Sequence, residues 1–412
     1  MKDSVRGLCM GAARCAGLFA CMALLSSCFQ SRVVSAIEEE ELFTLSYGNF
    51  EDQVNVFDMG EVGDVPIRLA MRDGFFYVTN GQSKKVMEFN SYGDLLSLYY
   101  NEDNNPEPSF LKAAQAATAT RKAVRYPFNE ISEIAIDSRK FLYAVDTLPL
   151  ERQELDEGSG QMLGQIVLRF SDSGSFVDYL GQQGPGGTPF PFIQNLYATN
   201  SNELVVVCTT NAGAVVYWFS TEGYLLFTVP IEKQSVPGPS SEEKNDVWLK
   251  IDSVVPDSRE RRLYVKVDYY VSQVDEASRV QSGIVYKESL LHALDVLDGS
   301  YGRPISVPAY TERVTEGFSS QTYSVPYELL GVTESGWFFF IVTTGEGFSL
   351  QMMQGDGQRI LQRRLRVDRR KNLFYTFSLG NTGILSVFLV QTSHATVAWW
   401  RTDSLIQAIL KN

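Results

Sequence analysis

The fold is decided by the stretch Ile67–Tyr100, which reads IRLAMRDGFFYVTNGQSKKVMEFNSYGDLLSLYY. It predicts four short strands in succession, at Ile67–Met71, Phe75–Val78, Val86–Phe89 and Asp94–Tyr100. The pair Asp73-Gly74 favours a tight hairpin turn between the first two strands, because both residues tolerate the backbone angles of such a turn. A single four-stranded meander cannot bury both of its faces, so it requires neighbours of the same kind.

The four-strand pattern recurs along the chain. Further copies begin near Ile131, Ile193, Trp248, Tyr327 and Phe374. Three copies share the spacing Phe-x-x-x-Gly, at Phe89/Gly93, Phe170/Gly174 and Phe219/Gly223. Outside its long breaks, the chain from residue 42 to residue 412 gives about 47 residues per copy, close to the length of one propeller blade.

We therefore predict an all-β fold, a six-bladed β-propeller with one short helical insertion, over residues 42–412. The alternatives are a β-sandwich or two smaller β domains, but no linker-like change of composition divides the chain. The strand Leu42–Tyr47 is predicted to complete the last blade and so close the ring. The segment Ser404–Leu410 competes for that place, or forms a terminal helix.

The first two copies resemble NHL-type repeats. The resemblance lies in Asp73–Val78 followed by Ser83–Val86, and in Ile134–Asp137 followed by Leu142–Asp146. It covers residues 66–195 and implies six blades, since NHL propellers usually have six. The family includes some enzymes and many binding platforms. The whole chain also resembles exported lipoproteins of spirochaetes.

The first 27 residues are predicted to be a lipoprotein signal peptide. Cations at the start precede an eleven-residue apolar run, Cys15–Leu25, which is too short to span a bilayer. The sequence Leu25-Ser26-Ser27-Cys28 resembles a lipobox, so Cys28 is the predicted lipidation site. Residues 28–41 then form an acidic tether. The alternative is ordinary cleavage after Ala36, which would discard Cys28.

Cysteine content and charge support an exported, acidic protein. Apart from Cys28 and the three cysteines of the signal, only Cys208 remains, and its apolar strand predicts a buried core thiol rather than a nucleophile. Removing the signal changes the formal charge from −13 to −15, because the signal carries three cations and Asp3. We therefore expect no nucleic-acid partner, and a bacterial cell-envelope location, periplasmic or surface, with the membrane contacted through lipid on Cys28.

The long breaks between strands are predicted to lie on one face of the propeller. Loops that join strands two and three, or strand four and the next blade, share a face, and every long break is of these kinds: 101–128, 147–163, 231–246, 271–283 and 309–325. We call this side the elaborated face and the opposite side, with its short turns, the tight face. Insertions confined to one face favour that face for binding.

Two charged or helical segments have alternative interpretations. Ser109 is predicted to cap a helix reaching Lys122, which would cover the channel, dock a partner or cover an apolar rim. The basic run Arg363–Lys371 either binds anionic lipid or an acidic partner, or protects an exposed outer strand from edge pairing; we favour protection.

Catalytic material is scarce. The only histidines, His292 and His394, are far apart in sequence, which disfavours a zinc site and a Ser-His-Asp triad. Gly184–Gly187 lacks the Lys-Ser/Thr of a phosphate loop and predicts a turn. Polar residues that interrupt the predicted first strands, which line a propeller's axis, are the candidate channel-mouth site: Arg68, Glu133, Asn195, Asp252 and Glu328.

These observations favour a lipid-anchored, non-catalytic binding platform with a protein partner in the cell envelope. No cofactor is expected for it. The alternative is a calcium-dependent propeller hydrolase acting on a lactone, ester or glycan, with the channel-mouth carboxylates binding the ion, since calcium prefers oxygen ligands. The simplest interpretation of each channel-mouth residue is a polar side chain facing a water-filled channel.

Overall fold

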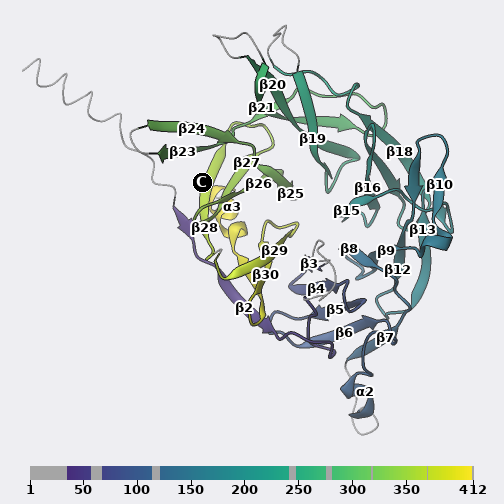
Figure 1. Ribbon diagram of the computed structural model, residues 1–412. Helices are drawn as coiled ribbons and strands as arrows, with labels where there is room; N and C mark the ends of the chain where they lie inside the picture. The colour runs from purple at the N-terminus through teal and green to yellow at the C-terminus, as the bar shows by residue number, and fades with distance from the viewer. Residues whose placement is uncertain are drawn as a thin grey trace, which may run out of the picture. The chain divides into compact units, whose positions relative to one another are not determined.

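A computed structural model describes residues 35–56, 67–113, 121–240, 247–274, 281–316, 319–368 and 370–410. The predicted signal peptide and Cys28 lie outside the described residues. Residues 36–412 form one compact unit. Its sheets are arranged as six blades around a central axis, numbered here in chain order (Figure 1). The predicted six-bladed β-propeller is confirmed.

The first three blades are built as follows. Blade 1 contains β3 (Ile67–Arg72), β4 (Phe75–Asn80), β5 (Lys85–Phe89), β6 (Leu95–Tyr100) and β7 (Lys122–Arg125). Blade 2 contains β8 (Ile131–Ile136), β9 (Leu142–Thr147), β12 (Gln165–Phe170), β13 (Phe176–Gly181) and β14 (Gly184–Pro185). Blade 3 contains β15 (Ile193–Ala198), β16 (Leu204–Thr210), β17 (Gly213–Phe219) and β18 (Leu225–Glu232).

The other three blades follow the same plan. Blade 4 contains β19 (Val247–Pro256), β20 (Arg262–Val274), β21 (Gln281–Asp295) and β22 (Ile305–Val307). Blade 5 contains β25 (Glu328–Val332), β26 (Trp337–Thr344), β27 (Gly347–Gln354), β28 (Ile360–Arg366) and β1 (Ala36–Ile37). Blade 6 contains β29 (Asn372–Leu379), β30 (Leu385–Gln391), β31 (Ala395–Trp400) and β2 (Glu40–Leu45).

The ring is closed by the N-terminal strand, as predicted, but this strand covers Glu40–Leu45 and not Leu42–Tyr47. Part of the predicted tether, residues 28–41, is therefore paired in blades 5 and 6. β2 pairs antiparallel with β31, with Phe43 opposite Val397, so blade 6 combines both ends of the propeller. The last residues form the terminal helix α3 (Thr402–Leu410), and its Ile406 is buried. Strand pairing thus joins segments more than 350 residues apart in the sequence.

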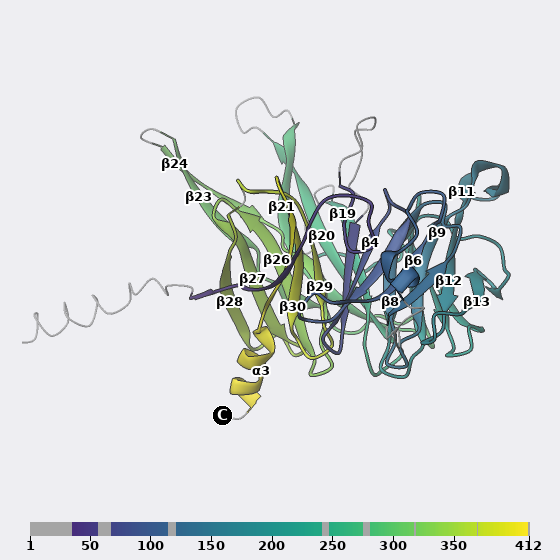
Figure 2. The ribbon, with the colours of Figure 1, turned by 90° about the horizontal axis from the view of Figure 1, so that it is seen from below.

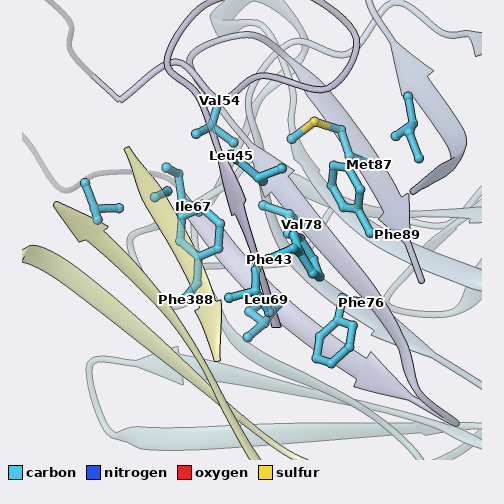
Figure 3. Close-up of a cluster of buried hydrophobic side chains, with 14 of the residues drawn as sticks. Phe43, Leu45, Val54, Ile67, Leu69, Phe76, Val78, Met87, Phe89 and Phe388 are labelled. Carbon is cyan, nitrogen blue, oxygen red and sulfur yellow. The ribbon is translucent and has the colours of Figure 1, made fainter. Parts of the chain in front are cut away.

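Aromatic packing joins blade 6 to blade 1. The ring of Phe43 lies 5.9 Å from that of Phe76 and 5.4 Å from that of Phe89, within a buried cluster that also includes Phe388 (Figure 3). Gly93 has φ +83°, and a Cβ there would lie 2.7 Å from the Cβ of Phe43. The Phe-x-x-x-Gly spacing therefore combines a core ring with a turn glycine that lets the neighbouring strand approach.

The predicted insertion helix is shorter than expected. α2 covers Ser109–Ala113, and residues 114–120 lie outside the described residues. The prediction that the helix reaches Lys122 is wrong, because Lys122–Arg125 forms β7, parallel to β6. Val124 packs against the buried cluster of blades 1 and 2 and Ala123 against that of blades 6 and 1, so tertiary packing outweighs local helix propensity here.

The basic run lies on the outer strand of blade 5. β28 is paired in parallel with β1, with Ala36 opposite Arg364. Arg364 lies 3.4 Å from Glu346, and Arg366 lies 3.6 Å from Glu38. β1 covers the edge of β28 beside Arg364 and Leu365, so the charges can protect only the uncovered part of this strand from edge pairing.

Asp146 should make stability depend on pH. Its carboxylate accepts hydrogen bonds from the backbone N–H groups of Asn129 and Glu130, but burial raises its pKa to about 6 from 3.8. An acid with a raised pKa stabilises the fold at low pH, and that contribution is lost as pH rises through about 6. Asp146→Asn removes the ionisation, so the free energy of unfolding of the variant relative to wild type should increase by up to about 3 kcal/mol between pH 3.5 and pH 7.5.

Urea denaturation of both proteins across this pH range measures the difference. A difference that stays constant with pH would show that Asp146 does not titrate with the raised pKa.

Candidate functional site

A cavity of about 990 Å³ lies on the axis of the propeller, and the first strands of all six blades line it. These strands are β3, β8, β15, β19, β25 and β29. The cavity also reaches between blades, where Thr209 and Gly213 of blade 3 and Thr343 and Phe348 of blade 5 line it. The fold thus brings polar residues that are far apart in the sequence together around one cavity.

All five candidate channel-mouth residues line this cavity: Arg68, Glu133, Asn195, Asp252 and Glu328. Glu328 is the first residue of its strand and Arg68 is the second. Glu133 and Asn195 are each the third residue of their strands, and Asp252 is the sixth. Each first strand follows a loop of the elaborated face, so the lining residues at the starts of these strands lie near that face. That the five residues bind a ligand remains a prediction.

Three of the long breaks project on one side of the ring, whereas the break 101–128 supplies β7 to the outer edge of blade 1. The hairpin β10 (Glu154–Asp156)–β11 (Gln161–Leu163), which follows the 3-10 turn Leu150–Arg152, projects beyond the ring on the same side as the ends of β20 and β21 and as the hairpin β23 (Tyr310–Glu316)–β24 (Ser319–Val325) (Figure 2). Helix α3 lies on the opposite side (Figure 2). We call the central cavity the funnel.

Arg68 and Glu133 form an ion pair across blades 1 and 2, from Nε of Arg68 to Oε1 of Glu133. Burial raises the pKa of Glu133, and the Arg68 charge partly opposes this effect. The pair therefore compensates a carboxylate that would otherwise be costly to hold in the cavity wall. Both residues were predicted as site residues from the sequence, but their contact with each other was not.

A polar cluster on blade 4 surrounds Asp252. Its carboxylate lies 3.1 Å from Nζ of Lys250 and 3.0 Å from Nζ of Lys266, and Lys266 is also 2.7 Å from Asp268. The hydroxyl of Ser289 donates to Asp268. Lys266 and Asp268 are buried and were missed by the sequence analysis, although their alternation within the apolar strand Leu263–Tyr270 is a signal that could have indicated them.

Glu328 differs from the other carboxylates in the funnel. Within the described residues it forms no ion pair or side-chain hydrogen bond. Protein surrounds the carboxylate although it contacts the cavity, so burial, followed by the nearby charge of Asp252, raises its pKa, and the charges of Lys250 and Lys266 partly oppose this effect. The pKa of Tyr197 is raised by burial and then by the charges of Glu133 and Glu328, so its phenol remains protonated beside both carboxylates.

One part of the funnel wall is aromatic. Tyr375, Phe377 and Phe348 line the funnel between blades 5 and 6, with Phe348 4.8 Å from Tyr375 and 5.0 Å from Phe377 between ring centroids. The hydroxyls of Tyr375 and Thr343 are 3.0 Å apart and form a hydrogen bond. The funnel therefore offers both an apolar surface and charged groups, the usual combination in small-molecule sites.

The tight face bridges the other end of the funnel. Nδ2 of Asn381 on blade 6 donates to Oδ1 of Asn200 on blade 3 over 2.9 Å, and Asn200 donates to Glu334 on blade 5 over 3.4 Å. The backbone N–H of Glu334 donates to the carbonyl of Asn381 over 3.0 Å. Because blades 3 and 6 are three positions apart in a ring of six, these contacts cross the axis and form the floor of the funnel.

Metal and nucleophile chemistry finds little support among these side chains. In the part of the chain that the structure describes, no group of three or more His, Cys, Asp and Glu side chains is placed to hold a metal ion. Cys208 is buried, and burial raises the pKa of its thiol. His292 is buried away from the funnel, 3.0 Å from the hydroxyl of Tyr269, and burial lowers its pKa.

None of the helices among the described residues has the length and apolar character needed to cross a bilayer.

Comparison with known proteins adds little to this description. No family model and no curated protein matches the sequence. Among solved structures, a glucose dehydrogenase is similar, with 10% identity, a TM-score of 0.41 and coverage of 87% of this chain and 98% of that chain. A calcium-binding protein, regucalcin from Agrobacterium tumefaciens, is similar with 10% identity, a TM-score of 0.36 and coverage of 89% and 95%. Similarity at this level says nothing about the activity of this chain. Its own sheets and cavity define the class, a six-bladed β-propeller with a central funnel.

Proposed function

We propose that this chain is a lipid-anchored binding protein of the bacterial cell envelope. Its propeller captures a protein partner on the elaborated face and catalyses no reaction. The observation that carries the proposal is that three insertions project on one side of the ring (Figure 2), the side on which the first strands that line the funnel begin. A partner on that face would contact the projecting hairpins and cover the funnel at once.

The hairpin β10–β11 supports this proposal in particular. Leu155 and Met162 are paired across its two strands, and they are 59% and 50% exposed. Leu150, just before the hairpin, is 81% exposed. Apolar side chains grouped in this way on a projecting insertion are typical of an interaction surface. Since Glu154 and Asp156 flank them, we expect a partner with an apolar patch and basic neighbours.

The second candidate, a calcium-dependent hydrolase, is favoured by the presence of Asp252, Glu133 and Glu328 in one cavity. Against it, lysines already contact Asp252 and an arginine contacts Glu133. Neither histidine nor cysteine is among the described residues that line the cavity. Metal analysis of the purified protein separates the candidates, because a tightly held calcium ion would favour the hydrolase.

A pull-down from crosslinked cells tests the platform directly. The wild-type protein should reproducibly retain one envelope protein. Recovery of none, together with turnover of a lactone, ester or glycan, would overturn the proposal.

Cys28→Ala tests the anchor. The variant should lose fatty-acid labelling, because a thioether-linked lipid needs the cysteine sulfur, and it should accumulate unprocessed or be released from the membrane. Metabolic labelling and N-terminal sequencing measure both effects. Persistent labelling, or a mature N-terminus at Ile37 in the wild-type protein, would contradict lipidation at Cys28.

A further inference from the structure

Each charged side chain that lines the funnel contacts an opposite charge among the described residues, with one exception. Arg68 pairs with Glu133, and Arg72 near the floor pairs with Asp73 at 3.6 Å. Two lysines and two aspartates form the blade 4 cluster: Lys250, Lys266, Asp252 and Asp268. Glu328 alone, among the described residues that line the funnel, has no cationic side chain in contact. The charged side chains that line the funnel therefore carry about one net negative charge.

Glu328 is placed to contact a ligand. It is the first residue of β25 and pairs with Ile341 of β26, and it lies near enough to Tyr197 of blade 3 and Asp252 of blade 4 for their charges to interact. Its side chain is exposed to the cavity, whereas Asp252 is 11% exposed and Asp268 is 1% exposed. An entering ligand therefore reaches Glu328 more readily than the two aspartates.

Aromatic rings line the funnel beside blade 5, the blade that carries Glu328. The hydroxyl of Tyr375 contacts Thr343. On β26, Thr343 lies two residues beyond Ile341, in the direction of the β26–β27 turn, and Ile341 is the residue opposite Glu328. Phe377 and Phe348 continue this wall. Rings attract organic cations through their electron-rich faces and accept apolar carbon through the hydrophobic effect.

We infer that the funnel binds one organic cation. Its ammonium or guanidinium group pairs with Glu328, and its apolar body lies against Tyr375 and Phe377. This inference rests on the proposed function in one respect, because it takes the funnel to be part of the surface that binds the partner. The cation comes either from a free amine or from a lysine or arginine side chain of the protein partner. A bare divalent metal fits less well, because it requires several oxygen ligands and Glu328 supplies one carboxylate.

Calorimetry with the purified full chain in mild detergent tests the inference. The probes are phenethylamine and butylamine, each compared with the neutral alcohol of the same size, 2-phenylethanol and butanol. Phenethylamine should bind at least tenfold more tightly than 2-phenylethanol, and more tightly than butylamine because it adds a ring. Glu328→Gln keeps the shape of the side chain and should remove the preference for the amine.

Glu346→Gln is the matched control, since Glu346 is a carboxylate of the same blade, is 81% exposed and lies outside the funnel lining. It should bind phenethylamine as wild type does. Equal binding of amine and alcohol by the wild-type protein, or an unchanged preference in Glu328→Gln, would overturn the inference.

Partner capture by Glu328→Gln distinguishes the two sources of the cation. Loss of capture together with loss of phenethylamine binding indicates a cationic side chain of the partner. Normal capture with loss of phenethylamine binding indicates a free amine. If no amine binds the wild-type protein while capture is normal in both proteins, the cation site is wrong and the binding platform still stands.

Discussion

Replacing Phe43 with alanine should lower the free energy of unfolding by about 3–5 kcal/mol, the usual cost of truncating a buried phenylalanine. Phe43 is 9% exposed and contacts Phe76 and Phe89 of blade 1 from the strand that completes blade 6. The change therefore removes core packing at the place where the ring closes. Urea denaturation, followed by tryptophan fluorescence, measures the effect.

Thr44→Ala is the control for Phe43→Ala. Thr44 is the next residue of β2 and is exposed, so the substitution should change the free energy of unfolding by less than about 0.5 kcal/mol. If Phe43→Ala costs no more than Thr44→Ala, β2 does not close the propeller as described.

Replacing Lys266 with methionine should cost a comparable amount, about 3–5 kcal/mol, because removing one partner leaves a buried charge uncompensated. Lys266 has no exposed side-chain surface and contacts both Asp252 and Asp268. After the substitution Asp252 keeps Lys250, but Asp268 keeps only the hydroxyl of Ser289. Thermal and urea denaturation measure the loss.

The double variant Lys266→Met/Asp268→Leu tests the cause. It removes the second buried charge as well, so it should recover at least half of the stability lost in the single variant. A double variant less stable than Lys266→Met would show that shape, not charge, determines the cost at this position.

The fold could be predicted because its signals are local and repeated. The Asp73-Gly74 turn, the alternating strands and the Phe-x-x-x-Gly spacing each reflect contacts within one blade or with the next. Closure by β2 was also predictable, since a ring needs a fourth strand in its last blade and Leu42–Tyr47 was available. The insertion helix was predicted too long, because the packing of Val124 beside blade 2 is not visible in the local sequence.

The candidate site was predictable as a set of positions and not as a set of contacts. First strands line the axis of any propeller, so polar interruptions such as Arg68 and Glu328 had to meet there. The partner of each residue depends on which side chains of the neighbouring blades lie at the same position along the propeller axis. The Arg68–Glu133 pair spans 65 residues and the Asn200–Asn381 contact spans 181, and neither leaves a pattern in one sequence.

Partner capture by face-specific variants tests the central claim most directly. Leu155→Ser with Met162→Ser alters the exposed pair on the elaborated face, and Leu297→Ser alters a residue that is 70% exposed in a β21–β22 turn of the tight face. All three side chains are exposed, so folding should be unaffected. In quantitative pull-downs from crosslinked cells, the hairpin variant should retain the partner at least tenfold less well, about 1.4 kcal/mol, while Leu297→Ser retains it as wild type does. Release of the partner by Leu297→Ser, with normal capture by the hairpin variant, would contradict binding on the elaborated face.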